Sequence, residues 1–171
     1  MKNEISEIGF GGSCHWCTEA IFQSLIGVSN VRQGWITSDL QNENFSEAVI
    51  LNFDSHIISL EVLIQIHLET HSCTANHSMR KKYRSAVYHT NENQQWAAVR
   101  ILRNYQNNFK SSIITQVIPL VDFKLNKIEQ LNYYYTNPEK PFCQTRINPK
   151  LKMLLTKFAS FVTNEKLSNL P

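Results

Sequence analysis

The spacing of hydrophobic and polar residues along the chain changes repeatedly, which predicts alternating strands and helices. Short apolar or alternating runs predict strands at 5–10, 28–36, 46–53, 83–89 and 113–121. Helices are expected at 16–26, 59–70, 91–108 and 150–162, with a short one at 129–135. We expect Ser59 and Thr90 to cap the helices that follow them, Gly27 to end the first helix, and 141–149 to be an extended segment.

The first ninety residues therefore read β-α-β-β-α-β, and a further helix, strand and helices follow. This order predicts an α+β fold, a two-layer sandwich with a ferredoxin-like core and C-terminal extensions. A chain of 171 residues, 42% of them hydrophobic, fits one domain spanning 1–171.

Charge and hydropathy exclude several classes of partner. The net charge is only +3, and the one dense basic cluster, 80–84, is smaller than a nucleic-acid-binding face usually requires. No apolar run approaches the roughly 18 residues of a membrane span, and the N-terminus lacks the features of a signal peptide. We therefore expect a cytoplasmic protein that binds neither nucleic acid nor membrane.

Two cysteines, Cys14 and Cys17, lie where a glycine-rich loop enters the first predicted helix. Free N–H groups and the helix dipole stabilise an anion there, so a lowered pKa is expected for the Cys14 thiol. Cys17 lies within one turn and is suited to resolve an oxidised Cys14 as a disulfide. Two alternatives stay open: both cysteines as small core residues, and metal binding, for which His71, Cys73 and His77 are close enough in sequence.

The segment GGSCHWCTEAIFQSLIGVSNVRQGW resembles the signature of the A-type peptide methionine sulfoxide reductases. Three later segments resemble the same family in the same order: SEAVILNFDSHIISLEVLIQIHLETH, KKYRSAVY and NPEKPFCQTRINPKLKML. The resemblance extends over about residues 5–158. It implies a ferredoxin-like α+β sandwich with added elements, in agreement with the pattern above.

The resemblance implies reduction of the S-epimer of methionine sulfoxide, free or in oxidised proteins, to methionine. Cys14 matches the nucleophile that becomes a sulfenic acid. Glu47 matches the acid that protonates the sulfoxide oxygen, and Tyr83 the tyrosine that hydrogen-bonds this oxygen. Trp16 matches the wall of the pocket for the substrate methyl group, where His15 replaces the family's phenylalanine beside the nucleophile.

Recycling of the nucleophile requires a second thiol. Cys17 and Cys143 are both candidates for the resolving cysteine, Cys143 on a C-terminal segment expected to be mobile, and Cys73 is interpreted as structural. The resemblance implies thioredoxin or another dithiol as external reductant and no bound cofactor. We expect a monomer.

The chain also departs from the family pattern. The loop after Trp35 is short and lacks one substrate-binding tyrosine, Ser78 replaces an aspartate, and 126–131 lacks a tyrosine and a histidine of the family. A weakened or inactive relative that binds a partner or senses oxidants through Cys14 is therefore the alternative function. A general thiol–disulfide oxidoreductase is disfavoured, because Pro119 is the only mid-chain proline that could serve as the cis-proline of a thioredoxin fold.

Overall fold

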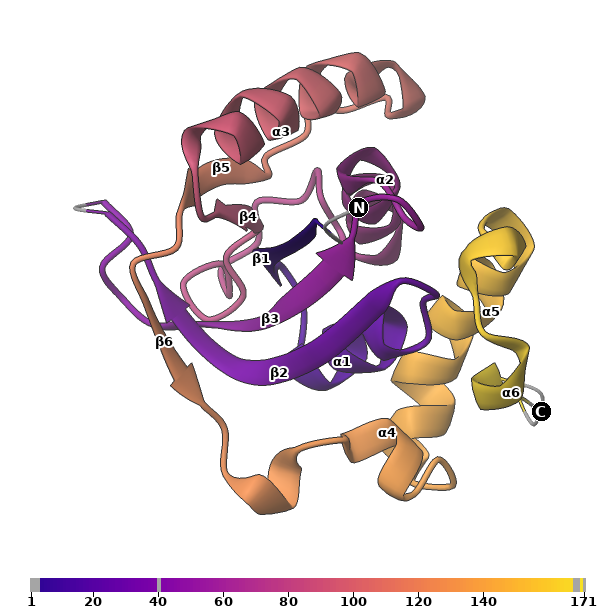
Figure 1. The fold of residues 1–171 in the computed structure, drawn as a ribbon. Helices are drawn as coiled ribbons and strands as arrows, with labels where there is room; N and C mark the ends of the chain where they lie inside the picture. Colours follow the sequence, from indigo (N-terminus) through magenta and orange to yellow (C-terminus); the bar gives the residue numbers. More distant parts are fainter. Residues whose placement is uncertain (1–3, 40, 168–169, 171) are drawn as a thin grey trace.

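The computed structural model describes residues 4–39, 41–167 and 170, and a six-stranded sheet lies at its centre (Figure 1). The strands are β1 (Ile5–Gly11), β2 (Val28–Thr37), β3 (Ser46–Asp54), β4 (Ala86–His89), β5 (Gln116–Pro119) and β6 (Asp122–Leu125). Their order is β5-β4-β1-β3-β2-β6, and only the β4–β5 pair is parallel. The central order β4-β1-β3-β2, with a helix in each crossover, confirms the predicted ferredoxin-like α+β core.

Helices cover one face of this sheet. The α-helices are α1 (His15–Gln23), α2 (Leu60–Thr70), α3 (Glu92–Tyr105), α4 (Tyr133–Thr136), α5 (Asn148–Lys157) and α6 (Asn164–Leu167). Short 3₁₀ turns occur at Gln106–Asn108, Ile128–Gln130 and Ala159–Phe161. Buried residues of α1, α2, α3 and α5 share one hydrophobic core with β1 and β3. A smaller apolar cluster, including Ile36 and Tyr88, lies apart from that core, and its buried members come from the strands.

The two predicted caps had different outcomes. Ser59 caps α2 as predicted, since its side chain accepts the Val62 N–H at 3.2 Å. The prediction that Thr90 caps α3 is wrong: Asn91 accepts the Gln94 N–H instead, at 2.9 Å. Thr90 donates its hydroxyl to the carbonyl of Glu7 in β1, so tertiary contact with the sheet decides between two suitable capping residues.

The strands around β4 are shorter than predicted. The expected strand 83–89 is reduced to β4, because the Tyr83 N–H bonds the Met79 carbonyl in a turn. The expected strand 113–121 contains β5 alone, and the chain then crosses the sheet so that β6 pairs with β2 at the opposite edge (Figure 1). The sequence pattern did not indicate β6, which is an edge strand with mostly exposed side chains.

The C-terminal region is folded against the rest of the molecule. The prediction of an extended segment at 141–149 is wrong: Cys143–Ile147 forms a π-helical turn that continues into α5. Ile147 and Leu151 have no exposed surface and belong to the main core. Burial of these side chains accounts for the folded, helical conformation of the segment. The helix expected at 129–135 is replaced by a 3₁₀ turn and α4. Within the described part of the chain, no helix has the length and apolar character of a membrane span.

Candidate functional site

A pocket of about 430 Å³ lies where β1 leads into α1. Both cysteines of the CxxC stretch, Cys14 and Cys17, line it. The other lining residues come from three segments distant in sequence: Gly12, Ser13, Ser72, His77, Met79, Tyr83, Phe142, Arg146 and Lys150. The fold thus brings three of the four matched segments to one cavity, through residues 12–17, Tyr83, and three residues of 142–150.

The backbone before α1 fixes the position of Cys14. Gly12 has φ +147, and a Cβ there would lie 2.5 Å from the His71 ring, so only glycine fits this turn. Cys14 then occupies the N-cap, where its carbonyl accepts the Cys17 N–H at 3.0 Å and the Thr18 N–H at 3.2 Å. The predicted placement of Cys14 at a helix N-terminus is therefore confirmed.

The prediction that the pKa of Cys14 is lowered is wrong for this geometry. The neighbouring Cys17 side chain, followed by burial, raises the pKa of the Cys14 thiol. Conversely, Cys14 lowers the pKa of Cys17, and Lys150 and Arg146 lower it further. Two adjacent buried thiols cannot both ionise easily, and these opposite shifts favour Cys17 as the first of the pair to ionise.

Glu47 is held beside the start of α1. It is only 7% exposed, so it is not a solvated carboxylate at the end of a strand. Its Oε2 accepts the His15 N–H at 3.0 Å, and its Oε1 lies 3.5 Å from the Lys82 ammonium. The carboxylate therefore sits at the positive end of the helix, one residue from the Cys14 N-cap.

Tyr83 reaches the pocket from the turn before β4. The Lys82 ammonium lies over the Tyr83 ring, 5.1 Å from the ring centroid. Arg80 donates from Nη1 to the carbonyls of Tyr83 and Gly12, at 3.0 and 2.9 Å. This bridging arginine ties the segment that carries Tyr83 to the loop that carries Cys14.

His15 is buried behind the pocket and is not among its lining residues. Its Nδ1 lies 3.1 Å from the Gly34 carbonyl, to which it donates, and its Nε2 accepts from the Asn126 amide at 3.3 Å. The carbonyl partner places a proton on Nδ1, and Nε2 also lies 3.8 Å from Glu47 Oε2. The His15 side chain thus links the start of α1 to β2 and to the residue that follows β6.

Trp16, expected to form the wall of the substrate pocket, is not among the residues that line it, and it belongs instead to an aromatic group that the sequence pattern did not indicate. Its ring stacks on Tyr133 with centroids 3.9 Å apart, and the edge of Phe142 packs 5.5 Å away. Phe142 in turn lines the pocket. The run of tyrosines at 133–135 was the only feature of the sequence that could have indicated this group. It lies more than 100 residues from Trp16, so the contact could not be predicted from the sequence.

The other two cysteines occupy different environments. Cys143 has no exposed surface, its thiol lies 3.6 Å from the Asn137 carbonyl, and burial raises its pKa. Cys73 is buried outside the pocket lining, and burial raises its pKa to about 11. His71, one of the metal-ligand candidates, instead bonds the His67 carbonyl and the Ser85 hydroxyl. Among the described residues, no group of three or more His, Cys, Asp or Glu side chains is arranged to hold a metal ion.

Comparison with known proteins gives a consistent family. A family model described as peptide methionine sulfoxide reductase matches residues 6–161. The chain is 31% identical to the peptide methionine sulfoxide reductase MsrA of Nitratiruptor sp., covering 89% of this chain and 95% of that protein. It is 33% identical to the protein of the same name from Vesicomyosocius okutanii, covering 83% of this chain and 93% of that protein.

Solved structures share the fold. Methionine sulfoxide reductase A of Corynebacterium diphtheriae superposes with a TM-score of 0.69 at 21% identity, covering 81% of this chain and 77% of that one. Mxr1 of Saccharomyces cerevisiae in its reduced form gives a TM-score of 0.71 at 16% identity, covering 84% and 91%.

Proposed function

The chain belongs to the peptide methionine sulfoxide reductase family, whose oxidoreductases act on methionine sulfoxide, and we propose that it reduces the S-epimer with Cys14 as nucleophile. The observation that carries this proposal is that Cys14, Cys17 and Tyr83 line one pocket. Glu47 is not among the residues that line this pocket, but its carboxylate accepts the backbone N–H of His15, the residue after Cys14. This arrangement supports Cys14 as nucleophile, Glu47 as acid, Tyr83 as hydroxyl donor and Cys17 as second thiol.

The first step transfers the sulfoxide oxygen to Cys14. Cys17, whose pKa is the lower of the two, takes the Cys14 proton as the Cys14 sulfur attacks the sulfoxide sulfur. Glu47 supplies a proton to the oxygen, and the Tyr83 hydroxyl hydrogen-bonds it. The substrate sulfur gains two electrons and leaves as methionine, while Cys14 loses two electrons and becomes a sulfenic acid.

The second step releases the oxygen as water. The Cys17 sulfur attacks the sulfur of the Cys14 sulfenic acid, a sulfur–sulfur bond forms and the sulfur–oxygen bond breaks. Cys17 is the better placed resolving thiol, because it lines the same pocket and lies one helical turn away. Cys143 remains the alternative, which requires the π-helical turn around it to open.

An external dithiol then restores both thiols, and no bound cofactor is required. We propose thioredoxin for this role. One structural neighbour, Mxr1 of Saccharomyces cerevisiae, was solved in complex with Trx2, and it superposes on this chain with a TM-score of 0.59. We further propose that the substrates are oxidised proteins or free methionine sulfoxide. We also propose that the protein is a single-domain monomer located in the cytoplasm.

The test is reduction of racemic dabsyl-methionine sulfoxide with a dithiol reductant, followed by separation of the epimers. The expected result is loss of the S-epimer with the R-epimer unchanged. Consumption of neither epimer, in protein that is folded by circular dichroism, would refute the proposal.

A second candidate function is oxidant sensing through the cysteine pair. The departures from the family pattern favour it: the short loop after Trp35 lacks one substrate-binding tyrosine, and 126–131 lacks a tyrosine and a histidine of the family. A sensor would form the Cys14–Cys17 disulfide with stoichiometric peroxide but would not reduce dabsyl-methionine sulfoxide. The two experiments, run on one preparation, separate the two functions.

A further inference from the structure

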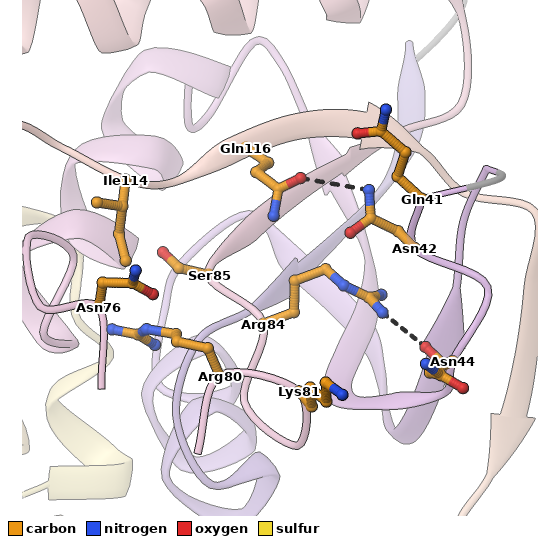
Figure 2. Close-up of a pocket in the computed structure, with 10 residues that line it drawn as sticks. All are labelled: Gln41, Asn42, Asn44, Asn76, Arg80, Lys81, Arg84, Ser85, Ile114 and Gln116. Atoms are coloured by element: carbon orange, nitrogen blue, oxygen red, sulfur yellow. Dashed lines mark hydrogen bonds between the residues drawn. The ribbon is translucent and has the colours of Figure 1, made fainter. Parts of the chain in front are cut away.

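A second pocket, of about 460 Å³, lies beside the turn that precedes β4 (Figure 2). We call it the Arg84 pocket. It is lined by Gln41, Asn42, Asn44, Asn76, Arg80, Lys81, Arg84, Ser85, Ile114 and Gln116. None of these residues lines the pocket that contains the two cysteines, so the two cavities are separate.

The lining of the Arg84 pocket is strongly cationic and polar. Three of its side chains carry a positive charge, Arg80, Lys81 and Arg84, and among the described residues that line it there is no Asp or Glu. All the others except Ile114 carry an amide or a hydroxyl group. A cavity with positive charge, hydrogen-bond donors and no negative charge is electrostatically suited to an anion.

Arg84 is the central charge of this pocket. It is only 6% exposed, and the described residues offer it no carboxylate within ion-pairing distance. Its guanidinium donates to two neutral oxygens, the Asn44 carbonyl at 2.7 Å and the Tyr88 hydroxyl at 3.3 Å. A guanidinium has five N–H donors, and a buried charge without a counterion is costly. Arg84 therefore has both the charge and the donors to take an anion.

The other two cations differ from Arg84. Arg80 uses its guanidinium to hold the surrounding loop, donating to the carbonyls of Gly12, Ser72, Ala75 and Tyr83. It contributes charge to the pocket but few free donors. Lys81 is exposed, and its ammonium is free to approach a ligand at the rim.

The amides define the opposite wall. Asn42 donates to the Gln116 side chain at 3.3 Å, as Figure 2 shows, and to the Asp39 carboxylate at 3.4 Å. Asp39 is not among the residues that line the pocket. Both bonds are long and so easily exchanged for bonds to a ligand.

We propose that the Arg84 pocket binds a small polar molecule through an oxyanion, a phosphate or carboxylate group seated on the Arg84 guanidinium. The planar fork of arginine matches both kinds of group with two parallel hydrogen bonds. The volume suits a small metabolite, whose polar remainder the amides of Asn42 and Gln116 would contact. Such a ligand would bind close to the reaction site, since Arg84 follows Tyr83 and donates its N–H to Ser46, the residue before Glu47.

Titration calorimetry of the full chain at constant ionic strength tests this proposal, with inorganic phosphate and succinate as separate probes. Saturable binding of at least one probe is expected. Phosphate binding more tightly would identify a phosphate group as the ligand chemistry, and succinate binding more tightly would identify a carboxylate.

Two variants locate the site. Gln116→Glu places a negative charge on the wall at an exposed position, and Arg84→Gln removes the central charge. Each is expected to weaken binding roughly tenfold or more. Gln95→Glu is the matched control, because it makes the same change of charge at an exposed position outside both pockets, and it should bind as the parent does.

Circular dichroism melting shows whether Arg84→Gln is folded. If it is not, Gln116→Glu carries the test alone. The proposal is overturned if neither probe binds saturably, if binding is unchanged in Gln116→Glu, or if Gln95→Glu weakens it equally.

Discussion

The backbone N–H of His15 donates to the Glu47 carboxylate at 3.0 Å, and this bond joins the first turn of α1 to β3. The bond holds the Glu47 carboxylate at the backbone of the residue that follows Cys14, although Glu47 lies 33 positions after Cys14 in the sequence. This placement is the basis on which we propose Glu47 as the proton donor to the sulfoxide oxygen.

Replacing Glu47 with glutamine should slow the chemical step by about a hundredfold, the usual scale for loss of a positioned acid. The amide oxygen can still accept the His15 N–H, so the fold and substrate binding should change little. Single-turnover reduction of the S-sulfoxide measures the step. Glu61→Gln, an exposed position on α2, is the control, and equal rates in the two variants would show that Glu47 has no catalytic role.

The Cys14→Ser variant should have no reductase activity. A serine hydroxyl at neutral pH is not ionised and does not replace a thiolate as the nucleophile. Cys73→Ala, which removes a thiol outside the pocket, should keep activity near the parent level. Retention of activity by Cys14→Ser would place the nucleophile elsewhere.

One equivalent of substrate without reductant should give a disulfide between Cys14 and Cys17. Cys17 lines the pocket beside Cys14, whereas Cys143 is enclosed and must be released by opening a helical segment, at a cost in packing. Peptide mapping of the trapped protein identifies the pair. Linked peptides containing Cys14 and Cys143 would assign recycling to the C-terminal segment and make Cys17 a packing residue.

Removal of Cys17 should lower the pKa of Cys14. The Cys17 side chain is the largest cause of the raised Cys14 pKa, so in Cys17→Ala only burial and the Glu47 charge still oppose ionisation. Iodoacetamide alkylation of Cys14, followed by mass spectrometry as a function of pH, should show its midpoint at lower pH than in the parent. Cys143→Ala is the control and should leave the midpoint in place. A midpoint that rises in Cys17→Ala would contradict the coupling of the two thiols.

Acid should destabilise the protein through two buried histidines. Burial lowers the pKa of His67, and burial lowers that of His71 from 6.5 to about 4, with Arg80 and Lys150 adding to both shifts. A histidine kept neutral in the folded state favours folding fully above pH 6.5, and this contribution is lost as the pH falls toward 4. His71 alone should account for about 3 kcal/mol of the free energy of unfolding over that interval.

Urea denaturation at pH 7 and pH 5 measures the part of this loss of stability that occurs between those two pH values. His71→Gln keeps a hydrogen-bonding side chain without titrating, so its stability should fall less between the two pH values. His77→Gln, at an exposed position, should behave as the parent does. An equal loss of stability in His71→Gln would show that other groups control the acid transition.

The sequence by itself determined the order of the elements in the ferredoxin-like core and the position of Cys14 where a loop enters a helix. These features depend on local chemistry: hydrophobic spacing along the chain, a serine able to cap α2, and glycines at the turn before α1. It also determined the family, because four separated segments keep their residues in the same order.

Only the tertiary structure decided the ionisation of the cysteine pair and the environment of Cys143. The helix dipole that acts on Cys14 is local and could be predicted. The burial of the two thiols could not, and neither could the effect on Cys17 of Arg146 and Lys150, which lie more than 120 positions away in the sequence. The stack of Trp16 on Tyr133 and the burial of Cys143 likewise come from the C-terminal segment folding onto α1. Such contacts join residues far apart in the chain, and no periodicity or local motif encodes the partner that each side chain will meet.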